Sequence, residues 1–134
     1  MNTSDSRTVQ LSTAGVIWLQ LSVVYLIVGV GMGIAMGASH DFTLRPVHAH
    51  INLLGWATMA LAGLVYTLFP AAAASKLARL HFWLHNISLP LFMLMLGLVV
   101  QGNLAVVPVL VIAQFLAAAS VLVFAANLFI NLKR

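Results

Sequence analysis

Five histidines are the side chains of this 134-residue sequence best suited to bind a metal ion or move a proton, and four of them form two pairs. His48 and His50 follow Arg45 at the start of one long apolar stretch, and His81 and His85 lie at the start of another. Hydrocarbon tolerates ionisable side chains poorly, so a histidine in such a stretch is a candidate functional residue. The sequence has no cysteine, which excludes disulfides, Cys-ligated zinc, iron–sulfur clusters and covalently attached haem.

The first pair lies at the beginning of a predicted helix. Pro46 suits the first helical turn, because the N–H that proline lacks would have no helical partner there. Residues two apart on a helix point in nearly opposite directions, whereas residues four apart share a face. His48 should therefore share its face with Asn52 and Gly55, while His50 points elsewhere.

This geometry favours His48 over His50 as the ligand of a buried cofactor. Asn52 can form a hydrogen bond on the same face, and Gly55 leaves room for a macrocycle. Arg45, one turn above, is placed to pair with a haem propionate at the membrane surface, since its guanidinium suits carboxylates. The alternative is an interfacial histidine that is solvated by lipid headgroups.

The second pair, His81 and His85, is four residues apart and hence on one helix face. Such a pair can hold copper or another metal, or supply one haem ligand and a residue that supports it. Alternatively, His81 lies at the membrane interface beside Trp83 and only His85 is immersed. Depth along the helices further predicts a polar cluster of both histidines with Tyr66 and Asn127.

The elements that carry these residues are membrane helices. Hydrophobic residues make up 63% of the chain and charged residues 6%, with a mean hydropathy of +1.09. Four apolar stretches, about 12–37, 47–69, 80–100 and 104–130, each exceed the roughly 20 residues that span a bilayer. We expect an all-α, integral membrane four-helix bundle that forms a single transmembrane domain over residues 1–134.

The basic residues indicate the topology of this bundle. They lie at helix ends and not in a patch beside aromatic residues, which argues against nucleic acid as a partner. One side of the membrane receives Arg7, Lys76, Arg79, Lys133 and Arg134, and the other Arg45 with Asp41. The positive-inside rule then places the N- and C-termini in the cytoplasm. In a bacterium this would be the inner membrane.

The segment Thr43-Leu44-Arg45-Pro46-Val47-His48, followed by an apolar helix that ends near Phe69-Pro70, resembles the second helix of subunit I in haem-copper oxidases. The similarity is greatest to C-type cytochrome oxidases and nitric-oxide reductases. The glycine-rich half of the first stretch also resembles the family's first helix, although glycines at these spacings equally suit close helix packing. The resemblance implies that His48 is an axial ligand of a non-covalent haem b. Such oxidases have about twelve helices and additional histidines, which argues against a complete oxidase here.

Depth also limits how the histidines share a cofactor. His48 and His85 should be about 15–25 Å apart at 1.5 Å per residue, whereas two axial nitrogens on one iron are about 4 Å apart. Either the chain has two sites, or His48 shares iron with His40, His50, Met36 or another protomer. Because symmetric dimers are the commonest oligomers, we expect a homodimer.

These features predict a haem protein of the lipid bilayer that transfers electrons from a respiratory donor or binds a diatomic gas. The alternatives are a haem carrier or sensor, or an accessory subunit of a respiratory complex without turnover of its own. Whether the chain is an enzyme stays open at this stage.

Overall fold

The computed structural model describes residues 12–132, and every regular element in this range is helical. The elements are α1 (Thr13–Ser39), α2 (Arg45–His50), the π-helical segment η1 (Ile51–Thr58), α3 (Met59–Leu68), α4 (Pro70–Ala73), α5 (Lys76–Val100), the 3₁₀ turn η2 (Leu104–Val106) and α6 (Val107–Asn131). Because α2, η1 and α3 run on without a break, the chain has four helices long and apolar enough to cross a membrane. The predicted all-α membrane bundle is confirmed.

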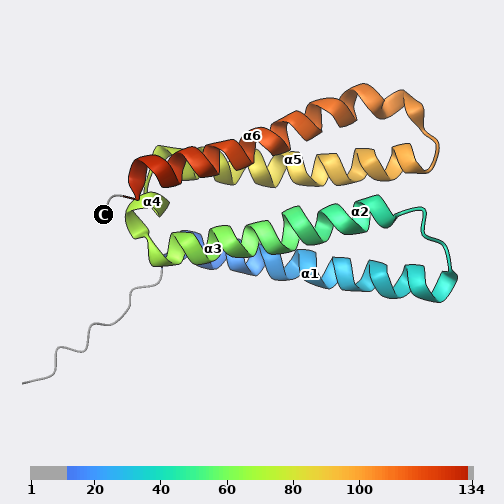
Figure 1. Ribbon diagram of the computed structural model, residues 1–134, viewed down its shortest axis with the longest axis horizontal. Helices are drawn as coiled ribbons and strands as arrows, with labels where there is room; N and C mark the ends of the chain where they lie inside the picture. The colour runs from blue at the N-terminus through green and yellow to red at the C-terminus, as the bar shows by residue number, and fades with distance from the viewer. Residues whose placement is uncertain (1–11, 133–134) are drawn as a thin grey trace, which may run out of the picture.

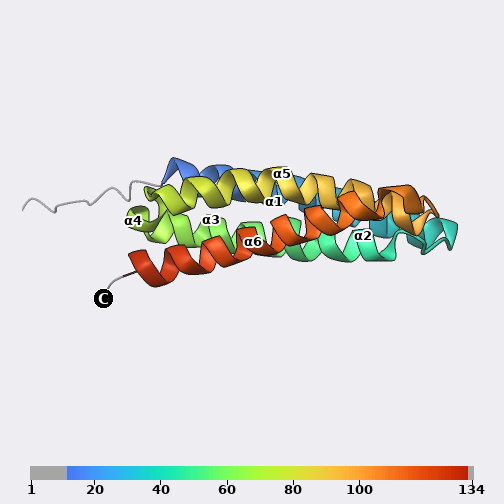
Figure 2. The same ribbon diagram turned by 90° about the horizontal axis from the view of Figure 1, so that it is seen from above.

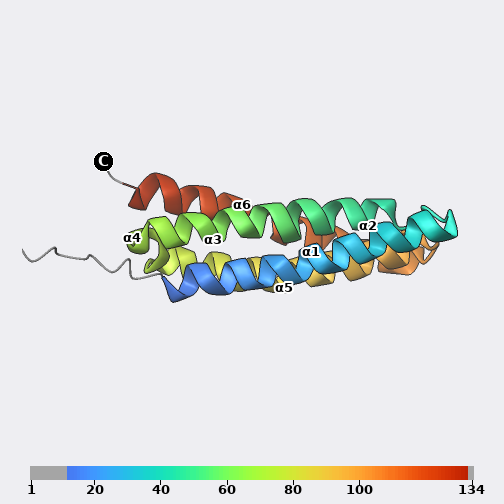
Figure 3. The same cartoon turned by 90° about the horizontal axis from the view of Figure 1, so that it is seen from below.

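The four spans form two antiparallel hairpins that pack against each other (Figure 1). In one hairpin α1 packs along the span made by α2, η1 and α3, and in the other α5 packs along α6. The views from above and below show the helices running nearly parallel to the long axis (Figures 2 and 3). The beginning of α1 and the end of α6 lie at the end of the bundle that carries α4 (Figure 1).

Two spans begin earlier than the sequence pattern predicted. The second begins at Arg45 instead of 47, and the third at Lys76 instead of 80. The third starts there because the hydroxyl of Ser75 accepts a hydrogen bond from the backbone N–H of Ala78 (2.9 Å), which caps the first turn. The residues from Lys76 to Arg79, which the prediction assigned to the loop, therefore belong to the helix.

Glycines bring α1 and the second span into close contact. A Cβ on Gly15 would lie 2.8 Å from the carbonyl oxygen of Gly63, so the two backbones approach too closely for larger residues. Towards the other end, Gly29 and Gly33 face side chains of the second span, whereas Gly31 has no neighbour within 4 Å. Helix packing therefore accounts for Gly15, Gly29 and Gly33.

The outer faces of the helices carry large apolar side chains. Phe129 is 90% exposed and Phe115 is 74% exposed on α6. The interior holds a core of apolar residues such as Trp18, Met59 and Leu89, together with buried polar residues that include Ser22, Ser88 and Ser120. Because the outer faces are apolar and polar side chains such as these serines are buried, the surface of these helices suits a lipid bilayer.

Candidate functional site

His48 is half-buried on the face of the second span that contacts α1, where its ring lies against Gly33. The side-chain nitrogen of Asn52 donates a hydrogen bond to the carbonyl oxygen of His48 (2.8 Å) and lies 3.4 Å from Nδ1 of the same residue. Since a carbonyl only accepts, the amide orientation of Asn52 is fixed and Nδ1 faces an N–H group. The neutral ring of His48 therefore carries its proton on Nε2.

His50 has the opposite arrangement. Its Nδ1 lies 2.8 Å from the carbonyl oxygen of Pro46, so Nδ1 donates and Nε2 keeps a free lone pair. The half-buried ring packs at 66° against Phe92 of α5, with a centroid distance of 5.0 Å. Metal-ligating histidines commonly donate their other ring N–H to a carbonyl in this way. The hydrogen bonds therefore favour His50 over His48 as a ligand, which the face argument alone did not reveal.

The remaining residues predicted around His48 pack against α1 or lie at the surface. A Cβ on Gly55 would lie 2.5 Å from the ring of Tyr25, so Tyr25 fills the space that the sequence suggested for a macrocycle. The amide of Asn52 fills the corresponding space at Gly29. Arg45 is exposed, and its guanidinium lies 5.2 Å from the ring centroid of Phe42.

The predicted inner cluster exists, and Asn127 is its centre. The side-chain nitrogen of Asn127 donates to the carbonyl oxygen of Ala72 (3.1 Å) and to the hydroxyl of Tyr66 (3.2 Å). Its side-chain oxygen accepts from Ser75 (2.8 Å) and Asn131 (2.7 Å). Because the carbonyl of Ala72 fixes the amide orientation, the hydroxyl oxygen of Tyr66 is an acceptor towards Asn127.

The proton of Tyr66 consequently points to His81, whose Nδ1 lies 2.9 Å from the Tyr66 hydroxyl. The His81 ring is fully buried and stacks between Trp18 (4.5 Å, 22°) and Phe124 (4.9 Å, 26°). With Nδ1 accepting, Nε2 carries the proton. Within residues 12–132 this Nε2 is the one buried side-chain polar atom without a hydrogen-bond partner. His81 is thus inside the bundle and not in an interfacial belt.

His85 uses both of its ring nitrogens. Nε2 donates to the carbonyl oxygen of Leu54 (3.2 Å) in η1, and Nδ1 lies 2.9 Å from the hydroxyl of Ser120. π-Helical segments often occur at functional sites, and here one faces a histidine. The rings of His81 and His85 meet at 74° with centroids 5.6 Å apart.

The contacts of His85 revise its predicted depth and its partner. The ring of His85 reaches the carbonyl of Leu54, six residues from His48, which corresponds to about 9 Å along the second span and is a smaller depth difference than the sequence suggested. Ser120, and not Asn127, contacts its ring. The part of the chain that the structure describes contains no group of three His, Cys, Asp or Glu side chains arranged to hold a metal ion.

No protein-family model matches the chain, and the searches of curated proteins and of solved structures also gave no match. The similarity to haem-copper oxidases therefore rests on the residues from Gly29 to Pro70 alone, and haem binding stays a prediction.

Proposed function

We propose that this chain is a membrane protein that binds haem b non-covalently and acts in electron transfer or in binding a diatomic gas, with His50 as an iron ligand. The observation that carries the proposal is the hydrogen bond from Nδ1 of His50 to the carbonyl of Pro46, which leaves Nε2 free. The other histidines of the helical spans, His48, His81 and His85, carry the ring proton on Nε2, so their Nε2 has no lone pair to offer to iron.

The residues around His50 would suit a bound haem. His50 contacts α5 through Phe92, whereas His48 and Gly55 contact α1, so a cofactor on His50 does not need the space that Tyr25 fills. Arg45 would pair with a propionate, because guanidinium and carboxylate match in shape and charge. The bound iron would supply one-electron chemistry or an open position for a gas.

The second ligand is the reason to propose a homodimer. His50 would supply one iron ligand from each protomer, and a symmetric partner would supply the second. We place both termini in the cytoplasm on the distribution of basic residues, and in a bacterium the site would face the periplasm. A respiratory electron donor on either side of the membrane could reduce the bound haem.

Absorption spectroscopy of the protein purified with haem available during expression tests this proposal. The wild type should give a Soret band, and His50→Phe should lose it, because phenylalanine keeps an aromatic ring against Phe92 but has no lone pair. His48→Phe is the matched variant on the same helix and should retain the band. A Soret band that is absent from the wild type contradicts haem binding. A band that survives in His50→Phe and disappears in His48→Phe makes His48 the ligand.

A haem carrier or sensor is the competing function. A haem that is reduced and reoxidised reversibly in the membrane, and that stays bound during turnover, supports electron transfer. Transfer of the haem to a haem-free acceptor protein on mixing would instead support the carrier.

A further inference from the structure

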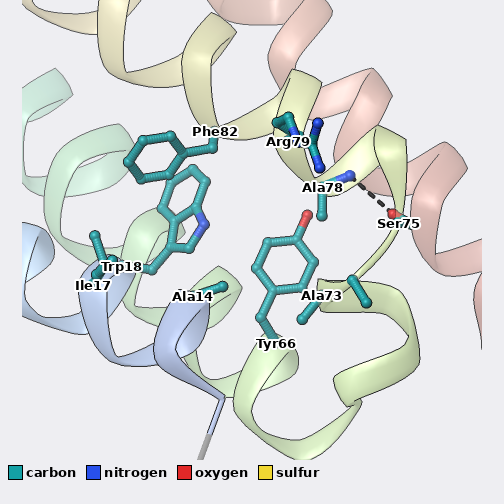
Figure 4. A pocket seen from close by; sticks show the side chains of 10 residues that line it. Ala14, Ile17, Trp18, Tyr66, Ala73, Ser75, Ala78, Arg79 and Phe82 are labelled. Atoms are coloured by element: carbon teal, nitrogen blue, oxygen red, sulfur yellow. Dashed lines mark hydrogen bonds between the residues drawn. The ribbon is translucent and has the colours of Figure 1, made fainter.

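A pocket of about 310 Å³ opens between α1 and α5 at the end of the bundle that carries α4 (Figure 4). Its walls include Ile17 and Trp18 of α1, Tyr66 of α3, and Arg79 and Phe82 of α5. Ile17 is 39% exposed, whereas Trp18 is 1% exposed. The pocket therefore leads from the lipid-facing surface of α1 to a buried aromatic floor.

The aromatic walls suit a flat ring. Trp18 and Phe82 meet edge to face at 90° with centroids 5.6 Å apart, and the ring of Tyr66 lies 6.2 Å from that of Trp18. Aromatic side chains attract a further ring through their faces and edges. The volume falls at the lower end of the roughly 300–1,000 Å³ typical of small-molecule sites.

Polar side chains also line the pocket. Arg79 only donates hydrogen bonds. Within residues 12–132 the single acidic side chain is Asp41, which follows α1 at the opposite end of the bundle from the pocket. Arg79 therefore has no carboxylate from the described chain and can donate to an oxygen of a ligand.

Tyr66 also lines the pocket, and its side chain is fully buried. Its proton points to His81, and one of its lone pairs accepts from Asn127. The hydroxyl of Tyr66 therefore has two hydrogen-bond partners inside the bundle. Figure 4 shows the hydroxyl of Tyr66 on the side of the pocket where Arg79 and Ala78 lie.

We propose that this pocket binds the head group of a lipid-soluble quinone or quinol. The aromatic walls would contact the ring, and Arg79 would donate to a ring oxygen. The opening beside Ile17 gives the apolar tail a path into the bilayer. A phospholipid head group has acceptor oxygens for Arg79 but no ring to contact the aromatic walls. The site lies apart from His50, and the proposal holds whether or not haem binds.

The test uses haem-free protein in detergent, in which Trp56 and Trp83 are replaced by phenylalanine so that Trp18 alone fluoresces. Titration with a short-chain quinone should quench Trp18 saturably. Ala14→Phe, which fills the pocket from α1, should weaken binding about tenfold or more, as expected for loss of about 1.4 kcal/mol. Since haem is absent, failure here says nothing against haem binding, and failure of haem binding leaves this result unchanged.

A matched pair of variants tests the role of Arg79. Arg79→Gln should weaken quinone binding about tenfold, as loss of a charge-assisted hydrogen bond does, while Lys76→Gln, one turn earlier and outside the pocket, should not. Quenching that is linear and equal in wild type and Ala14→Phe reports partition into micelles and overturns the proposal. Full displacement of the quinone by phosphatidylglycerol at equal mole fraction also overturns it, in favour of a lipid site.

Discussion

The side-chain nitrogen of Asn127 lies 3.2 Å from the hydroxyl oxygen of Tyr66, and this contact joins the last span to the second across 61 residues of sequence. The same amide reaches the carbonyl of Ala72, so its orientation is fixed and the proton of Tyr66 is directed to His81. One amide on α6 thus decides which nitrogen of a buried histidine on α5 carries a proton.

Asn127→Ala should lower the free energy of unfolding by about 1–3 kcal/mol, the usual cost of leaving a buried polar group without a partner. The change removes the donor to both Ala72 and Tyr66. Asn86→Ala is the control, because the amide of Asn86 makes one local bond to the carbonyl of Phe82 (2.8 Å). Thermal unfolding in detergent, followed by far-ultraviolet circular dichroism, measures both. Equal losses in the two variants would contradict the central role of Asn127.

The sequence was sufficient to predict the four spans, but not to predict which residues pack against each helix face. Hydropathy located all four spans, and helical periodicity correctly placed His48, Asn52 and Gly55 on one face. Periodicity says nothing about which helix covers that face, so Tyr25 was missed. The hydrogen bond from His50 to Pro46 could have been predicted from the sequence, because the two residues are four apart and a histidine side chain can reach back one helical turn.

The inner cluster was predictable only in part. Counting depth along the helices identified Tyr66, His81 and Asn127, whose polar side chains are rare in an apolar chain. It missed the carbonyl of Leu54, because every residue has a carbonyl and its exposure to His85 depends on the local π-helical geometry. It also missed the stacking of Trp18 on His81, which requires the hairpins to be placed relative to each other.

Gly29→Ala should destabilise the hairpin of α1 and the second span by about 1–3 kcal/mol, as overpacking does. A Cβ at Gly29 would lie 2.6 Å from the amide of Asn52, which is itself held by the carbonyl of His48. Gly31→Ala is two residues away with nothing within 4 Å, and it should be neutral or stabilising because alanine favours the helix. Unfolding midpoints in denaturant compare the two. A neutral Gly29→Ala would mean that α1 does not pack as described.

Nitrogen-15 NMR of histidine-labelled protein should distinguish the two rings of the first pair. Under alkaline conditions that keep histidine neutral, His50 should carry its proton on Nδ1 and His48 on Nε2, because their hydrogen bonds differ. His81 and His85 should resemble His48. Assignment uses single histidine substitutions. A His50 ring protonated on Nε2 would remove the basis for its choice as a ligand.

The absence of cysteine allows the topology to be tested with single cysteines. Ala74→Cys lies after α4, at the end shared by the start of α1 and the end of α6, and Gln101→Cys lies at the opposite end after α5. Both positions are exposed. If the positive-inside rule holds, an impermeant maleimide labels Gln101→Cys in intact cells and Ala74→Cys only after permeabilisation. The reverse pattern would put both termini outside.

Asp41 in the loop between α1 and α2 should respond to pH through Thr43. The carboxylate accepts from the hydroxyl (2.6 Å) and the backbone N–H (2.9 Å) of Thr43, and these bonds lower the pKa of Asp41 below its ordinary value. Since the pKa is lowered, the charged loop conformation is stabilised above the ordinary value and is lost as pH falls through the lowered one. Thr43→Val removes the hydroxyl bond and should raise the pKa, which a carboxyl-carbon NMR titration measures. Ser39→Ala removes an acceptor for the Asp41 backbone N–H and a donor to the carbonyl of Met36, but no bond to the carboxylate, and should leave the pKa unchanged. An unchanged titration midpoint in Thr43→Val would show that the hydroxyl does not hold the carboxylate in solution.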